Sequence, residues 1–498
     1  MSKQAHIAVD LGAESGRVIV GALEDQRLTL HETHRFRHLP IPTPAGLCWD
    51  VTGLWQQILA GLREAAVYCR EHDQEVLSVG VDTWGVDFTL LSEAGVMLGL
   101  PRGYRDTRFR AGFEAVTAQL DRPEIYRHTG IQIMPFNSLY QYAARHAEQP
   151  EVFELATDIA FMPDLFHWLL CGQARVERTI ASTSQMVDVR TGTWNTQLLD
   201  RLGLPTGPLK EPVDAGTPIG SLTPAVALAT GLAQSVRVVV PPSHDTASAV
   251  AAVPADPATR WCFLSSGTWS LLGAELDRPR IDDATAAANF TNELGMQGTT
   301  RFLKNIAGLW LVQEVRRDLE RQGQELDYAE LTEQAAGAEP FRTLLPVNDP
   351  AFAEPGNAIA RIRDYAKASG QPLPQSVGQL VRACLESLAL EYRRTLHQMQ
   401  DVLGQQFEVL HLVGGGGKNG LLNRMTAHAT GIPVVVGPEE ATAMGNLLSQ
   451  AVGTGRLADL AAMRTVVQQS IELNRIEPGD RHGWDAPFDR YQNLPPIN

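Results

Sequence analysis

Residues 6–23 have the sequence HIAVDLGAESGRVIVGAL, which predicts two β-strands joined by a tight turn. The first strand, His6–Leu11, is apolar up to Asp10, and the second, Arg17–Leu23, is rich in the β-branched residues that favour strands. The turn between them, 12–16, begins and ends with glycine. A third strand-like run, a helical periodicity and another strand follow at 27–36, 50–73 and 77–82. This order predicts an α/β module with a mixed sheet.

The second half of the chain repeats the pattern. A buried strand at 237–240 leads through the residues PPSHD into a short helix that ends near Pro254. Two further strands, 261–264 and 269–276, flank a Ser/Gly turn at 265–268. The likeness to the N-terminus is one of pattern rather than of identity, and it indicates a duplicated domain.

In the rest of the second half, predicted helices and strands alternate. Ser376 and Gln379 have the spacing of a capping box and begin a long helix, 376–403. A strand is expected at 408–413, followed by a run of four glycines at 414–417 and a helix from about 421. A further strand at 432–436 and a final helix from 441 complete the pattern. The proline-rich tail, 493–498, has the composition of a disordered terminus.

Composition limits the possible functions. The 498 residues carry a net charge of −15, and such an excess of carboxylates disfavours binding to nucleic acid phosphates. A mean hydropathy of −0.13 and the lack of an apolar run of about 18 residues disfavour a membrane span. The five cysteines are scattered and form no C-x-x-C pair, which argues against a disulfide framework and a zinc site. We therefore expect an acidic, multi-domain protein of the reducing cytoplasm.

Two glycine-containing turns, one in each half, are candidates for phosphate binding. In residues 10–17, DLGAESGR, a carboxylate ends a strand beside exposed backbone N–H groups. Such a turn can cradle phosphate while Asp10 holds a hydrated Mg²⁺. The second turn, SSGTWS at 265–270, offers hydroxyls and a glycine in the same way. Each alone is also compatible with an ordinary hairpin, but two such turns are less expected by coincidence.

A third glycine-rich segment, GGGGKNG at 414–420, lies between a predicted strand and a predicted helix. Four glycines are costly in backbone entropy unless a ligand or a special turn needs them. Gly415, Gly417 and Gly420 also satisfy G-x-G-x-x-G, with Glu439 about 20 residues on, which is a dinucleotide-binding pattern. Nucleotide contact and a packing loop both remain open here.

Three carboxylates elsewhere are candidates for acid–base chemistry. Asp245 follows His244 at a predicted helix start, where it could be either an N-cap or a general base toward a substrate hydroxyl. Asp82 and Asp87 flank Trp84-Gly85 in GVDTWGVDF, 80–88. An aromatic ring and a glycine between carboxylates are typical of sugar sites, although the same residues could simply bound a turn.

Taken in order, these segments resemble the FGGY carbohydrate kinases from Ile7 to about Gly455. The motifs shared with the family in general are DLGAESGR, FMPDLFHWLLCG, SSGTWS and the late glycine loop followed by AMGN at 443–446. Other motifs resemble the branch of the family that phosphorylates L-rhamnulose: GVDTWGVDF, YRDTR, GIQIMPFNSLYQ, SHDTASAV, NFTNE and LKNIAGLWLVQE.

The resemblance implies an α/β fold of two RNase H-like domains, as in actin-like ATPases, flanking a central cleft. The sugar would lie mainly on the N-terminal domain and ATP mainly on the C-terminal domain. With the boundary placed near Pro241-Pro242, the expected domains are an N-terminal sugar-binding domain, a C-terminal nucleotide-binding domain and a C-terminal extension, at 1–243, 244–460 and 461–498.

The resemblance also implies roles for individual residues. ATP contacts are expected at Ala13, Glu14, Ser15, Gly16, Arg17, Thr268, Gln313 and Gly415. Sugar contacts are expected at Gly85, His244, Asp245, Thr246 and Asn305, with Asp245 as the catalytic base and Asp10 as the metal residue. Ala13 stands where a phosphate-binding Thr is common in the wider superfamily, so backbone contacts rather than a hydroxyl contact are expected there.

The implied activity is ATP-dependent phosphorylation of L-rhamnulose at its 1-hydroxyl in L-rhamnose breakdown, with Mg²⁺ accompanying ATP. The expected partners are small molecules only, without nucleic acid or membrane, and the protein is expected to be a cytoplasmic monomer or homodimer. Three alternatives are weighed against this function: a kinase for another ketose such as L-fuculose or xylulose, a non-catalytic sugar sensor on the same scaffold, and a dehydrogenase built on the late glycine loop.

Overall fold

The computed structural model describes residues 3–479 and 481–497, which form two compact units. The first unit contains 1–254, 275–302 and 441–471, and the second contains 255–274, 303–440 and 472–498. Each unit is therefore assembled from three segments of the chain. The linear division into 1–243, 244–460 and 461–498 stays a prediction about sequence domains, and the compact units are composed differently.

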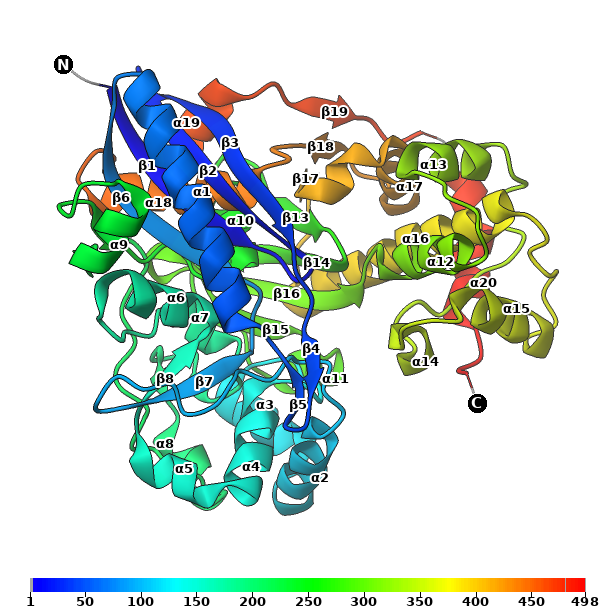
Figure 1. Ribbon diagram of the computed structural model, residues 1–498. Helices are drawn as coiled ribbons and strands as arrows, with labels where there is room; N and C mark the ends of the chain where they lie inside the picture. The colour runs from blue at the N-terminus through cyan, green and yellow to red at the C-terminus, as the bar shows by residue number, and fades with distance from the viewer. Residues whose placement is uncertain (1–2, 480, 498) are drawn as a thin grey trace. The chain divides into compact units, whose positions relative to one another are not determined.

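The first unit is built on a six-stranded mixed sheet (Figure 1). Its strands, in spatial order, are β11 (Pro218–Ser221), β12 (Arg237–Val239), β6 (Gln74–Thr83), β1 (Lys3–Leu11), β2 (Ser15–Glu24) and β3 (Arg27–Arg37). β1 is antiparallel to β2 and parallel to β6, and β12 is parallel to β6. The mixed sheet expected from the N-terminal sequence is confirmed.

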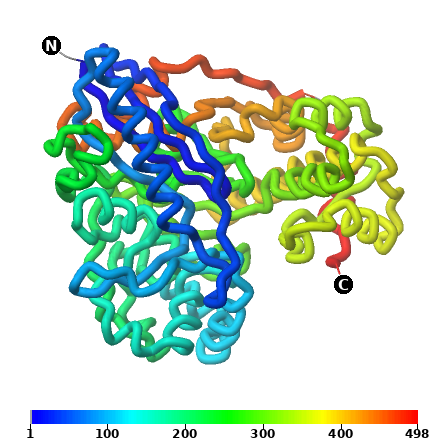
Figure 2. Tube along the Cα trace, viewed as in Figure 1, coloured from blue at the N-terminus to red at the C-terminus, as the bar shows by residue number. Residues whose placement is uncertain are grey.

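Helices cover both faces of this sheet. The helix α1 (Val51–Glu71) buries Leu54, Ile58, Leu62 and Ala65 against it, and Figure 1 shows α1 lying along β1–β3. On β2, Val18 touches α1 at Gly61, whereas Gly21 touches Leu447 of α18 (Ala441–Gly453). Since alternate residues of a strand face opposite sides, α18 covers the other face. Figure 2 shows this late segment beside the N-terminal strands.

A second layer of the first unit has a core of its own. The two-stranded antiparallel sheet of β7 (Phe88–Ser92) and β8 (Ala156–Phe161) packs with several helices around a separate hydrophobic cluster. The helices of this region include α2 (Phe109–Gln119), α3 (Arg122–Thr129), α4 (Ser138–Glu148) and α7 (Arg178–Ser182), whereas α6 (Met162–Cys171) packs with the core of the six-stranded sheet. The short helix α10 (Asp245–Ala251) follows β12 and packs against α18.

The second unit contains most of a seven-stranded sheet of order β15-β16-β14-β13-β17-β18-β19. β15 (Thr291–Leu294) and the first residues of β16 (Thr300–Ala307) belong to the first unit. The remaining strands are β14 (Trp269–Leu276), β13 (Trp261–Ser266), β17 (Val409–Val413), β18 (Val434–Val436) and β19 (Asn474–Ile476). The expected β-turn-β unit is present, since β13 and β14 are antiparallel around the turn.

The helices of the second unit agree with most of the sequence expectations. Ser376 caps α16 (Val377–Leu403) and forms the predicted capping box with Gln379. The helix α12 (Trp310–Arg321) follows β16, and α17 (Gly420–Thr430) follows the glycine loop. The helix at Ala441 is not the final one, because α19 (Leu460–Ser470) and α20 (Asp485–Gln492) come after it.

The expectation of a disordered tail is wrong for its described residues. The carbonyl of Pro495 accepts a hydrogen bond from Tyr365 Oη at 3.0 Å, and the Ile497 N–H donates to Asp349 Oδ2 at 2.9 Å. These contacts fix the tail to the second unit, whereas Asn498 lies outside the described residues. Within the part of the chain that the structure describes, no helix is long and apolar enough to cross a bilayer.

Candidate active site

Three carboxylates gather at one end of the first sheet. Asp10, near the end of β1, pairs in register with Asp82 on β6. The next residue, Thr83, lies directly beside the segment that precedes α10. Its N–H donates to the Ser243 carbonyl at 2.9 Å, and it forms a parallel β-bridge with His244. Asp245 is therefore brought to the same end of the sheet. Its charge and that of Asp10 both act on Asp82.

Asp82 is fully buried and is held from one side. Its Oδ2 accepts a hydrogen bond from Asn446 Nδ2 at 2.6 Å, and its Oδ1 has no hydrogen-bond partner among the described residues. Burial raises the pKa of Asp82 well above its usual value, the charge of Asp10 raises it further, and the bond from Asn446 opposes both. A bound ligand or ion could supply the partner that Asp82 Oδ1 lacks, so this carboxyl is a strong candidate for a binding residue.

Behind Asp82 runs a chain of buried hydrogen bonds. Asn446 Oδ1 accepts from Gln450 Nε2 at 2.6 Å, Gln450 Oε1 accepts from Ser78 Oγ at 2.6 Å, and Ser78 contacts His6 Nδ1 at 2.8 Å. Small residues allow these contacts: a Cβ on Gly445 would lie 1.9 Å from the backbone of α10. The AMGN motif thus packs α18 on α10 and aims an amide at Asp82.

Asp10 completes the acidic group. Its Oδ2 accepts a hydrogen bond from Arg17 on β2, which is its antiparallel neighbour. The described residues contain no cluster of three or more His, Cys, Asp or Glu side chains arranged as a metal cage. Mg²⁺ usually keeps several waters and takes only one or two carboxylates, so oxygen donors such as those of Asp10 and the unpaired Asp82 Oδ1 fit this ion.

Asp245 is the first residue of α10, and His244 is its N-cap, so the N-cap interpretation of Asp245 is wrong. Its Oδ1 accepts hydrogen bonds from its neighbour Thr246, from N at 2.5 Å and from Oγ1 at 3.1 Å. The side chain keeps 29% of its surface exposed. Burial raises the pKa of Asp245, and the nearby Asp10 also raises it, while His244 lowers it. One carboxylate oxygen is thus fixed and the other is available to accept a proton.

His244 is oriented by a buried ion pair that the sequence analysis did not single out. Its Nδ1 lies 3.1 Å from Arg301 Nη1 and 3.3 Å from Glu293 Oε2, and its Nε2 lies 3.4 Å from Asp245 Oδ1. Burial alone would raise the pKa of Glu293, but Arg301 and His244 outweigh it and the pKa is lowered. Glu293 belongs to the NFTNE motif, which was the only signal for it.

Gly85 lies beside this histidine. A Cβ on Gly85 would be 3.4 Å from His244 Nε2 and 3.3 Å from Thr183 Oγ1. The first unit therefore brings together Gly85, His244, Asp245 and Thr246, which are four of the five residues expected to contact the sugar. The fifth, Asn305, lies on β16 in the second unit.

The turn predicted between the first two strands, a candidate for phosphate binding, is present. Between β1 and β2, the Gly12 N–H donates to the Ser15 carbonyl at 2.9 Å, and Ala13, Glu14 and Ser15 are partly exposed. Gly16 is required by packing, since a Cβ there would lie 2.4 Å from the ring of Phe36. Arg17 is occupied by its bond to Asp10.

The nucleotide residues expected in the second unit also converge. Gln313 Nε2 donates to Thr268 Oγ1 at 3.2 Å, and Gln313 Oε1 has no partner among the residues described. Gly308 lets the chain before α12 approach the β13–β14 turn, because a Cβ there would lie 2.5 Å from the Trp269 carbonyl carbon. The glycine loop reaches the same place, and Gly414 approaches the carbonyl of Ser266.

The four glycines of that loop have different requirements. Gly414 has a φ of +88°, and a Cβ on Gly416 would lie 2.0 Å from Ser266 Oγ, so both are explained by local structure. Gly417 is close to Val436. Gly415 is exposed, and no described atom would lie within 4 Å of its Cβ. Packing therefore explains every glycine of the run except Gly415.

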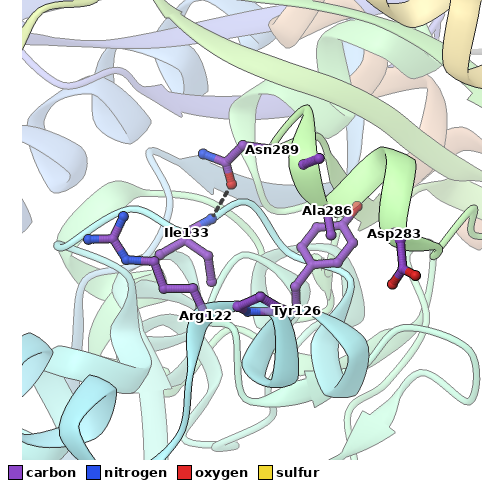
Figure 3. A pocket seen from close by; sticks show the side chains of 8 residues that line it. Arg122, Tyr126, Ile133, Asp283, Ala286 and Asn289 are labelled. Atoms are coloured by element: carbon purple, nitrogen blue, oxygen red, sulfur yellow. Dashed lines mark hydrogen bonds between the residues drawn. The ribbon is translucent and has the colours of Figure 1, made fainter.

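A pocket of about 450 Å³ lies elsewhere in the first unit (Figure 3). It is formed by α3 and the helix α11 (Asp283–Ala287), with Arg122, Tyr126 and Asp283 in its wall. Asn289 accepts a hydrogen bond from the Ile133 N–H at 2.9 Å across it. None of its lining residues is one of the predicted site residues. We therefore place the candidate active site at the carboxylate cluster and not in this pocket.

Comparison with known proteins decides the family. The models of the N-terminal and C-terminal domains of the FGGY family of carbohydrate kinases match residues 5–252 and 262–454. The chain belongs to this family. The rhamnulokinase of Bacteroides thetaiotaomicron is 42% identical over 491 residues, which are 99% of each chain. That of Pectobacterium atrosepticum is 39% identical over 492 residues, covering 98% of this chain and 96% of the relative.

Solved structures support the fold of an FGGY kinase. The gluconate kinase of Lactobacillus acidophilus has a TM-score of 0.81 and 14% identity, covering 99% of this chain and 98% of that one. The glycerol kinase of Plasmodium falciparum with ADP has a TM-score of 0.80 and 14% identity, covering 100% and 99%. The predicted fold class is confirmed. FGGY carbohydrate kinases are phosphotransferases, so the sensor and dehydrogenase hypotheses are rejected.

Proposed function

We propose that this FGGY kinase transfers the γ-phosphoryl group of ATP to the 1-hydroxyl of L-rhamnulose, giving L-rhamnulose 1-phosphate in L-rhamnose breakdown. The observation that carries the proposal is the His244–Asp245 pair, with one fixed and one available oxygen on Asp245, beside the buried carboxylates of β1 and β6. The full-length similarity to rhamnulokinases supports the choice of sugar.

The chemistry requires only one proton acceptor on the protein. The 1-hydroxyl oxygen attacks the γ-phosphorus, the bond to the β–γ bridging oxygen breaks, and ADP leaves. The hydroxyl proton passes to the available oxygen of Asp245. A raised pKa makes this carboxylate a stronger base than an ordinary aspartate. The difference between its pKa and that of the alcohol it must deprotonate is therefore smaller.

Four other residues would hold the sugar. His244 presents Nε2 on the side of Asp245, because the Arg301–Glu293 pair fixes Nδ1. Gly85 has no side chain beside that ring, since a Cβ there would already lie at van der Waals distance from His244 Nε2, and Thr246 and Asn305 offer a hydroxyl and an amide. Buried polar groups of this kind reject substrates that leave them unpaired, so they supply selectivity among ketoses.

We expect two sets of residues to contact ATP. Ala13, Glu14, Ser15, Gly16 and Arg17 present the first turn, and Thr268, Gln313 and Gly415 converge in the second unit. Among the residues that the structure describes, Gln313 Oε1 has no hydrogen-bond partner and no side chain packs where a Cβ of Gly415 would lie, and contact with a nucleotide would explain both features. Mg²⁺, when bound, supplies positive charge to the polyphosphate, and Asp10 is the residue that we expect to hold it.

The test is a screen of ADP release with L-rhamnulose, L-fuculose, D-xylulose and D-ribulose as acceptors. We expect kcat/KM to be highest for L-rhamnulose and the Asp245→Asn variant to lose roughly 10²–10⁴-fold in turnover on every sugar. A higher value for another ketose would overturn the choice of substrate while leaving the kinase family intact. Gel filtration should find a monomer or a homodimer, and we expect the enzyme to act in the cytoplasm.

A further inference from the structure

Asp87 is a buried carboxylate that the proposed chemistry does not use. It is 1% exposed and accepts hydrogen bonds from two indoles, Trp49 Nε1 at 2.7 Å and Trp84 Nε1 at 3.0 Å. It also accepts from the Tyr104 N–H and from Gln141 Nε2, each at 3.1 Å. One side chain thus collects donors from four separate segments of the first unit.

Three of these donors share a single oxygen, Oδ2. The two indoles that it joins pack together with ring centroids 4.1 Å apart, and both are nearly fully buried. Burying a carboxylate is costly, and a well-packed apolar residue would stabilise such an interior at least as well. A role other than stability is therefore indicated for Asp87.

The residues just before Asp87 form a strained turn. The Asp87 N–H donates back to the Gly85 carbonyl at 2.9 Å, which closes a three-residue γ-turn around Val86. Val86 has a φ of +67°, a region that β-branched residues almost never enter. Such strain persists only where the surroundings enforce it, and it gathers at functional sites.

The surroundings enforce it from both sides. The Val86 N–H donates to Thr183 Oγ1 at 3.2 Å, and its carbonyl accepts from Ser138 Oγ at 2.5 Å. The Trp84 N–H donates to the Leu11 carbonyl at 3.1 Å, one residue after Asp10. The turn 84–87 therefore connects the carboxylate cluster at one end with Asp87 at the other.

We propose that Asp87 is a positioning residue for the sugar: by holding Trp84 and closing the turn at Val86, it sets the place of the Gly85 backbone beside His244. This inference rests on the proposed function, since Gly85 and His244 are proposed sugar contacts. Asp87 itself lies behind the turn and takes no part in proton transfer. Burial, although opposed by its four hydrogen bonds, raises the pKa of Asp87 to about 7, which agrees with a carboxyl kept in place at some cost.

Steady-state kinetics of the full-length enzyme with L-rhamnulose and ATP test the proposal. Asp87→Asn keeps the size of the side chain but puts an N–H₂ group against one of its four donors. Trp84→Phe removes one donor and leaves Asp87 unchanged. For each variant we expect the KM for L-rhamnulose to rise about tenfold, as for the loss of one oriented hydrogen bond, and the KM for ATP to stay within about twofold.

Trp194→Phe is the matched control. Trp194 is also a buried indole of the first unit, but its Nε1 donates to the Lys210 carbonyl at 2.6 Å. This variant should lower the melting temperature without changing either KM. The wild type, assayed alongside, separates the possible failures. No turnover of L-rhamnulose by the wild type overturns the proposed function and this inference with it.

If the wild type is active and the KM for L-rhamnulose is unchanged in both Asp87→Asn and Trp84→Phe, the inference is overturned while the proposed function stands. Equal rises of both KM values in Trp84→Phe, matched by Trp194→Phe, would show that Asp87 only stabilises the fold, which also overturns it. If Asp87→Asn fails to fold, Trp84→Phe decides by itself.

Discussion

Replacing Asp245 by asparagine removes the proposed base with little other change. The hydrogen bonds from Thr246 N and Oγ1 both end on Asp245 Oδ1. An asparagine can keep its own oxygen in that place. The second oxygen is then replaced by an N–H₂ group, which donates but does not accept a proton. The start of α10 should therefore fold as in the wild type.

The size of the effect follows from the role. A positioned general base contributes roughly 10²–10⁴-fold to a rate, so kcat should fall by that factor, or about 3–5 kcal/mol in barrier height. The melting temperature at neutral pH should not fall. Burial and Asp10 raise the pKa of Asp245, which means that its charged form is disfavoured in the folded protein, and asparagine removes that cost.

The assay is ADP release with saturating L-rhamnulose and ATP, combined with calorimetric binding of each substrate. We expect both substrates to bind the variant within about threefold of the wild type. In the wild type, kcat/KM should fall as the pH falls through the raised pKa of Asp245, because only the deprotonated base accepts a proton. A folded Asp245→Asn enzyme with kcat within a few-fold of the wild type would refute the assignment of the base.

Three further predictions follow from the site. Gly415→Val should raise the KM for ATP much more than that for the sugar; the control Gly416→Ala, whose Cβ would meet Ser266, should instead lower the melting temperature, and equal KM rises for both substrates in Gly415→Val would contradict a nucleotide contact. Asn446→Leu removes the one side-chain donor to Asp82 found in the described part of the chain and should lower the free energy of unfolding by about 1–3 kcal/mol in urea titrations; an unchanged midpoint would contradict this. Because a phosphoryl donor and its acceptor must bind next to each other, a non-hydrolysable ATP analogue should tighten L-rhamnulose binding about 5–150-fold, and the sugar should tighten the analogue equally; calorimetry showing independent binding would refute the coupling.

Local sequence patterns predicted much of the backbone. Alternation and β-branched residues at the N-terminus gave β1 and β2, and the Ser376–Gln379 spacing gave the start of α16. These signals work because each is decided by neighbours in the sequence. The prediction of a disordered tail was wrong because the tail is ordered by residues distant in the sequence. Its hydrogen bonds are to Tyr365 and Asp349, more than a hundred residues away.

The site was predicted less completely, because its side chains are oriented from far along the chain. Asn446 lies 364 residues from Asp82, and Arg301 lies 57 residues from His244. No local pattern connects such pairs. The strained turn at Val86 also had no signal, since a β-branched residue argues against a positive φ and only tertiary contacts enforce it.

The most direct test of the central claim is the identity of the product. L-Rhamnulose has a single CH₂–OH carbon, C1, and its other hydroxyls are on CH carbons or, in the ring form, on the hemiketal carbon. In a proton-coupled ³¹P spectrum of the reaction with ATP and Mg²⁺, we predict one phosphomonoester, formed in equal amount to ADP, that couples to two methylene protons. A phosphoester coupled to a single proton would place the phosphate elsewhere, and inorganic phosphate alone would mean that water, not the sugar, accepts the phosphoryl group. Either result would contradict transfer to the 1-hydroxyl.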